Sequence, residues 1–250
     1  MSDNWTFFAS ICTIIIVFSV WAGPRLLYYV TYYSRVKSSK EIRELPDMNI
    51  SPEISALITR FNKSTRIRIA DEDNAIPQAA NFQQDPAYII ISKYALGQTN
   101  DEIVQLKTKH LLALVAHELG HIVLASKSTW LLYVFTSGAI GAWLFLFLTP
   151  VKFGWMGGLC SLIAFVIFMR AFNKVSCHDE YLADAFAVID ASVPADDLAE
   201  ALAGIKLHAV TQINSSAGRT KLTAVFNWIF GNSHPPVEHR IHRIQSLARD

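Results

Sequence analysis

Three long stretches without a charged side chain constrain the fold of this 250-residue chain more than any other feature. They cover residues 5–23, 130–148 and 153–169. A helix needs about 20 mainly apolar residues to cross the hydrocarbon core of a bilayer, and about 17 is the lower limit. Helices in the core of a soluble protein are usually shorter and carry a polar stripe. We therefore expect three transmembrane helices rather than buried helices of a soluble core.

Basic residues around these stretches predict how the chain crosses the membrane. Residues 1–4 contain no Lys or Arg, whereas Arg25 and Arg35 follow the first stretch closely. Because Lys and Arg are concentrated on the cytoplasmic side, the N-terminus is expected outside. The second and third helices then form a hairpin with Lys152 in its outer loop. The acidic N-terminal residues do not fit a secretory signal peptide, which favours an uncleaved anchor.

Composition and charge exclude other classes of protein. Hydrophobic residues make up 52% and charged residues only 17% of the chain, which is unusual for a soluble protein. The net charge of +1 leaves no basic excess for neutralising nucleic-acid phosphates. The three cysteines are an odd number and predict no disulfide framework, in agreement with a reducing cytoplasm. We therefore expect a protein in contact with a lipid bilayer and with no nucleic-acid partner.

Outside the apolar stretches, the hydrophobic pattern predicts a small domain of helices and strands. Alternating apolar residues or β-branched runs indicate strands, and apolar residues three and four apart indicate helices. We expect an α+β, mainly helical fold with a small antiparallel sheet. The expected helices cover residues 51–63, 107–126, 176–191, 194–213 and 237–247, and the expected strands cover 66–69, 80–83 and 87–92.

The segment His-Glu-Leu-Gly-His, residues 117–121, is the strongest chemical signal in the chain. His117 and His121 are four residues apart, so on a helix both imidazoles point from one face and can share a metal ion. Glu118 is rotated from them by about 100° and can reach a water on that metal. Chance gives this pattern only about 0.01 times in a chain of this composition. In an otherwise apolar helix, a metal would satisfy these groups better than backbone hydrogen bonds.

A catalytic zinc ion usually has three protein ligands and one position left for water, so a third ligand is expected from another segment. Glu180 is the best candidate, because Asp184 follows it by one helical turn on the same face. Asp184 could accept the second ring N–H of a zinc-bound histidine. Spacing alone leaves alternatives open. The two acids could form a solvated face, and His178 and His208 are rival ligands.

Two further motifs follow the His-Glu-Leu-Gly-His segment: Glu-Tyr-Leu-Ala-Asp at 180–184, beyond the hairpin, and His-Pro-Pro-Val-Glu-His-Arg-Ile at 234–241. Together the three motifs resemble those of the HtpX-like membrane zinc endopeptidases, relatives of the CAAX prenyl proteases. The resemblance extends from about residue 65 to the end of the chain. It implies a zincin-like domain with one Zn²⁺ per chain, in which Glu180 is the third ligand and Asp184 supports a zinc-bound histidine.

The resemblance also implies how further residues act. Glu118 is expected to take a proton from the attacking water and pass it to the departing amine. His234 or Arg240 is expected to donate a hydrogen bond to the oxyanion, although a structural role of His234 before Pro235 stays open. The strand before the zinc helix is expected to bind substrate, with Asn81 as the candidate residue.

These features predict a multi-pass protein of the bacterial inner membrane that cleaves membrane or membrane-proximal proteins in protein quality control. Two alternatives are an inactive zinc-binding adaptor or chaperone, which would not need Glu118, and an intramembrane-cleaving zinc protease. The latter would hold its motif within an apolar stretch, whereas the motif here precedes Lys127. The expected divisions are an anchor at 1–27, a hairpin at 128–172, and a cytoplasmic peptidase domain divided between 28–127 and 173–250.

Overall fold

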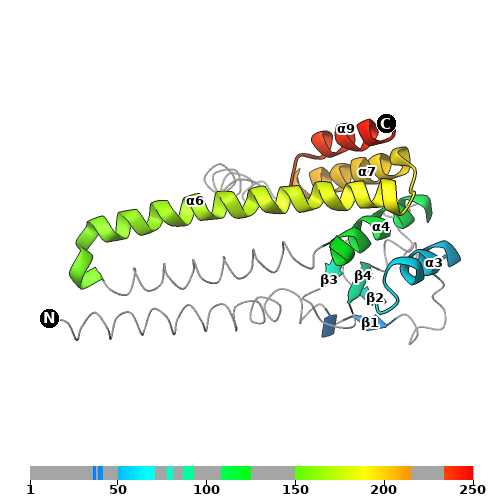
Figure 1. Ribbon diagram of the computed structural model, residues 1–250, viewed down its shortest axis with the longest axis horizontal. Coiled ribbons are helices and arrows are strands. Elements are labelled where there is room, and N and C mark those ends of the chain that lie inside the picture. The colour runs from blue at the N-terminus through cyan, green and yellow to red at the C-terminus, as the bar shows by residue number, and fades with distance from the viewer. Residues whose placement is uncertain are drawn as a thin grey trace.

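Helix α4 (Thr108–Leu124) lies at the centre of the part of the chain that the structure describes (Figure 1). A small sheet packs on one side of it, and helices from the second half of the chain pack on the other. This arrangement confirms the mainly helical fold. The computed structural model describes residues 36–37, 39–41, 50–70, 78–80, 87–92, 108–124, 150–214 and 234–249. The other helices are α3 (Pro52–Phe61), α6 (Pro150–Ala185), α7 (Ala195–Asn214), α9 (Val237–Leu247) and the short π-helix η5 (Phe186–Asp190).

The described strands form a four-stranded sheet in the order β1-β2-β4-β3. The expectation of an antiparallel sheet is wrong for its central pair, because β2 and β4 run parallel, with Ile67 opposite Ile89. Strand β3 comes between β2 and β4 in the sequence, but it lies on the far side of β4 and runs antiparallel to it. The neighbouring strands β2 and β4 therefore run in the same direction. Ile89, Ile90 and Ile91 are all buried, as is typical of a parallel strand covered on both faces. The strand bounds are β1 Lys40–Glu41, β2 Arg66–Ala70, β3 Gln78–Ala80 and β4 Tyr88–Ser92.

The predicted helices outside the apolar stretches are confirmed, with one correction. Helix α3 begins where Ser51 accepts a hydrogen bond from the backbone N–H of Ile54, and a proline occupies its first turn. Its apolar face is buried, as the spacing of the apolar residues predicted. The helix expected to start at 176 is instead the last part of α6, which begins at Pro150. No proline or glycine interrupts the chain between 159 and 185, so nothing in the local sequence ends the helix there.

Helix α6 contains the third charge-free stretch and continues through Glu180 and Asp184. Its first half extends beyond the other described elements (Figure 1). Among the described residues, no helix combines the length and the hydropathy that crossing a membrane requires. The other two stretches predicted to cross the membrane, 5–23 and 130–148, lie outside the described residues.

Gly120 allows α4 and α6 to approach each other closely. A Cβ atom at this position would lie 3.0 Å from the Cα atom of Ala183, 3.1 Å from its carbonyl oxygen and 3.1 Å from the ring of Phe186. Both Ala183 and Phe186 are buried, and neither backbone atom can move without moving α6 itself. The glycine is needed because the two helices that carry the candidate metal ligands touch through their backbones here.

We expect Gly120→Ala to lower stability and zinc affinity together. Overpacking a tight contact costs about 1–3 kcal/mol, and the better helix propensity of alanine returns at most about 1 kcal/mol. Separating α4 from α6 would also move Glu180 away from the histidines. Thermal unfolding and zinc competition titrations measure the two effects. Gly204→Ala is the matched control, because nothing lies within 4 Å of the added methyl group there. It should raise stability slightly, and an equal response of the two variants would contradict the close-contact explanation.

Candidate metal centre

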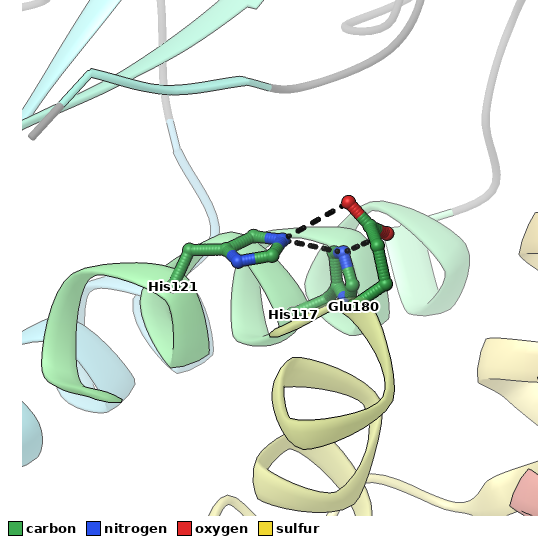
Figure 2. Close-up of side chains that lie close together, drawn as sticks. All are labelled: His117, His121 and Glu180. Atoms are coloured by element: carbon green, nitrogen blue, oxygen red, sulfur yellow. Dashed lines mark hydrogen bonds and ion pairs between the residues drawn. The ribbon is translucent and has the colours of Figure 1, made fainter. Parts of the chain in front are cut away.

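Two histidines of α4 and one carboxylate of α6 converge on a single point (Figure 2). The Nε2 atoms of His117 and His121 are 3.2 Å apart. Glu180 approaches both, with 3.4 Å from its Oε2 atom to Nε2 of His117 and 3.5 Å from its Oε1 atom to Nε2 of His121. His117 and Glu180 are buried, whereas the side chain of His121 is 25% exposed. The cluster is therefore anchored in the core and accessible on one side.

The separations within this cluster fit a zinc ion. Tetrahedral zinc with bonds of about 2.0–2.1 Å places its ligand atoms about 3.3 Å apart. The distance of 3.2 Å between the two nitrogens is close to that value. The distances of 3.4 and 3.5 Å run to different oxygens of Glu180, and one ligand atom from each of the three residues lies within 4.8 Å of the other two. Two imidazoles and one carboxylate are also a common donor set of catalytic zinc, which leaves a fourth position for water. Among the described residues these three form the one His, Cys, Asp or Glu group with such geometry, and the rival ligand His178 is exposed and outside it.

Asp184 fixes the orientation of His117. Its Oδ1 atom lies 2.9 Å from Nδ1 of His117, so the imidazole presents Nε2 to the metal position. Burial by itself would lower the pKa of His117, but contacts with Asp184 and Glu180 outweigh it and raise that pKa to about 9. Burial by itself would raise the pKa values of the carboxyls. Contacts with the surrounding histidines nevertheless hold the pKa of Glu180 below its usual range, and contacts with His117 and Arg240 do the same for Asp184. Both carboxyls are therefore ionised at neutral pH, as metal binding requires, and zinc would have to displace the proton that His117 carries without the metal.

The carboxylate of Glu118 contacts the sheet. Its Oε2 atom accepts a hydrogen bond of 2.5 Å from the backbone N–H of Ala79 in β3. Ala79 lies opposite Ile89 of β4, and alternate residues of an antiparallel pair direct their N–H groups outward. The side chain of Glu118 thus extends from α4 to the outer edge of β3, the last strand in the described sheet. Asn81, predicted to bind substrate, is outside the described residues, although β3 ends directly before it.

His234 and Arg240 come from the closing segment and reach the same cluster in different ways. The Nδ1 atom of His234 is 3.0 Å from Oε1 of Glu180, and its side chain is 71% exposed. Arg240 is buried on α9 and contacts both Glu180 and Asp184. The structure therefore brings all the predicted site residues that it describes to one place.

Sequence reasoning missed three features of this site: the Ala79 amide next to Glu118, the close approach at Gly120, and the link from Arg240 to both acids. A small residue inside the motif was the available signal for Gly120. The contact of Ala79 has no sequence signal, because a backbone amide donates regardless of its side chain.

Two histidines and a glutamate on one helix, with a carboxylate from a second helix beside the histidines, form the kind of site that zinc metallopeptidases use. The chain belongs to peptidase family M48, whose sequence pattern matches residues 70–248. Members of this family are zinc-dependent metallopeptidases, and the similarity to HtpX-like enzymes that the motifs predicted is confirmed. No curated protein matches the sequence significantly.

The fold is also similar to that of a solved structure. The crystal structure of S. mikatae Ste24p superimposes with a TM-score of 0.59 at 14% sequence identity. The match covers 93% of this chain but 56% of the other, so this chain spans little more than half the length of that protein. At this identity the likeness concerns the fold, and substrates and partners require their own arguments.

Proposed function

We propose that this protein is a membrane-bound zinc endopeptidase whose metal is held by His117, His121 and Glu180. The observation that supports it most is that one ligand atom from each of these residues lies within 4.8 Å of the other two, with Asp184 behind His117. When bound, zinc would supply a Lewis acid that polarises the scissile carbonyl and lowers the pKa of water towards 7.

Other side chains near the metal position would supply the general base and the oxyanion donor that peptide hydrolysis needs. Glu118 accepts the proton of the attacking water and delivers it to the departing amine, a role that its position next to His117 on α4 supports. His234 serves as the oxyanion donor, because its exposed imidazole contacts Glu180 through Nδ1 and directs Nε2 away from it. An extended substrate would pair with the outer edge of β3 beside Ala79, with Asn81 just beyond.

We further propose that the site works at the cytoplasmic surface of a bilayer, with the anchor, hairpin and divided peptidase domain predicted from the sequence. Ile163 and Ile167, one turn apart on α6, are 52% and 64% exposed, which supports a lipid-facing surface in the third charge-free stretch. Glu180 follows Arg170 by ten residues of helix, and at 1.5 Å per residue the site is about 15 Å beyond that charge. This distance disfavours cleavage within the membrane, and the presence of Glu118 disfavours an inactive adaptor. Quality control of membrane proteins is the role that such a site suits.

The test is a comparison of one cleavable segment in two contexts. Full-length protein in lipid nanodiscs should contain one zinc per chain and should cleave an unstructured segment much faster when a transmembrane helix anchors it to the same disc. A chelator should stop both reactions. The physical reason is that anchoring raises the effective concentration of the segment near the site. Equal cleavage of the anchored and free segments would contradict the location at the membrane surface, and a chain without zinc would contradict the enzyme.

A further inference from the structure

Two buried carboxylates one turn apart on α6 create an electrostatic problem near the metal position. Glu180 is 8% exposed and Asp184 is 2% exposed. Two ionised carboxyls held this close in the interior repel each other and lose their hydration, so a cation must lie near them. Arg240, from helix α9 more than fifty residues later in the chain, supplies that cation.

The guanidinium of Arg240 engages both acids with all of its nitrogens. Its Nε and Nη2 atoms donate to the two oxygens of Asp184, at 2.9 and 2.7 Å. Its Nη1 atom lies 2.8 Å from Oε2 of Glu180. A forked contact of this kind fixes the plane and rotamer of a carboxylate far better than a single point charge can.

Both carboxylates act on the metal position, so their orientation decides its geometry. Asp184 holds Nδ1 of His117, and Glu180 offers an oxygen within 3.4 Å of Nε2 of the same histidine. Arg240 therefore contacts two candidate ligands, because its Nη2 atom is also 3.3 Å from Nε2 of His117, and it contacts Asp184, the hydrogen-bond partner of that histidine. Its own side chain is only 8% exposed, which leaves little of it accessible to a substrate.

We propose that Arg240 is a positioning residue, which prepares the zinc site by holding Glu180 and Asp184 in place and does not touch the substrate. This inference rests on the proposed zinc site, and it assigns the oxyanion role to His234 rather than to Arg240. It also explains why a helix from the end of the chain must dock before the centre formed by α4 and α6 is complete.

The test measures zinc affinity separately from catalysis. In the full-length protein, Arg240→Gln should weaken zinc binding by about 10–100-fold in competition with a chromophoric chelator, as is typical when the partners of metal ligands are removed. At saturating zinc, kcat should fall much less. Arg240→Lys keeps the charge but not the fork, and should give an intermediate zinc affinity.

Arg243→Gln is the matched control. Arg243 lies one turn further along α9, is exposed, and also contacts α6, where its guanidinium is 4.7 Å from the ring centroid of Tyr181. This variant loses the same charge from the same helix, yet its zinc affinity should stay unchanged. Adding Asp184→Asn should reduce the further effect of Arg240→Gln, since the arginine would act partly through that acid.

Two results would overturn the proposal. Unchanged zinc affinity in Arg240→Gln combined with a large loss of kcat would make Arg240 a direct donor to the reacting group. If Arg240→Gln does not fold, Arg240→Lys decides alone, and a zinc affinity equal to that of the parent protein contradicts the positioning role. Failure of the proposed function is distinguishable, because it would appear as normal cleavage by Glu118→Gln whatever the zinc affinity of the Arg240 variants.

Discussion

Replacing Glu118 with glutamine should lower the rate of peptide hydrolysis by about 10²–10⁴-fold, the usual contribution of a general acid–base. The amide of glutamine cannot take up the proton of the attacking water. It has the same shape, however, and its oxygen can still accept the hydrogen bond from Ala79. Zinc affinity should therefore stay within about twofold of the parent value, because Glu118 is not among the three ligands.

The measurement pairs cleavage of the anchored reporter with zinc content and thermal unfolding of the same preparations. Glu53→Gln is a suitable control, since Glu53 is an exposed acid in the first turn of α3, far along the chain from the site. It should behave like the parent protein in every assay. Normal cleavage by the Glu118 variant would show that Glu118 is not the general base. Loss of zinc from the variant would mean that Glu118 binds the metal.

Replacing Glu180 with alanine should reduce zinc affinity by at least about 100-fold, because removing even an outer partner of a metal ligand costs about 10–100-fold. The change removes one of three ligands and leaves Arg240 and His234 without their shared acceptor. Activity should be lost in parallel with zinc and should recover partly at high zinc concentration. Glu180→Gln preserves the volume of the side chain, so comparing it with Glu180→Ala separates the effect of losing the ligand from the effect of creating a cavity.

Glu200→Ala is the control for this variant. Glu200 is also a glutamate whose carboxylate contacts a histidine, His110, but its side chain is 55% exposed on α7. Exposed ion pairs contribute about 0–1 kcal/mol, so stability should change little and zinc affinity should not change. Retention of full zinc affinity by Glu180→Ala would show that the third ligand comes from elsewhere in the chain.

Local patterns predicted the parts of this protein that depend on neighbouring residues. His117 and His121 share a face because a helix repeats every 3.6 residues, and Glu180 and Asp184 share another for the same reason. That periodicity predicted most of the helix bounds and a shared metal for the two histidines, whereas the roles of Glu180 as third ligand and Asp184 as its support were implied by the resemblance to known enzymes. The parallel pairing of β2 and β4 did not follow, because strand direction is decided by where the connecting chain crosses and not by alternation within a strand.

The sequence by itself determined which side chains could bind a metal and which faces of two helices would carry them. Only the tertiary structure decided that these faces meet at Gly120, that β3 presents the Ala79 amide to Glu118, and that Arg240 joins the two acids. The physical reason is that helix periodicity acts over a few residues, whereas these contacts depend on how elements distant in the chain fill one core. An arginine in a closing motif can donate to many acceptors, and its packed position between Glu180 and Asp184 selects which ones it reaches.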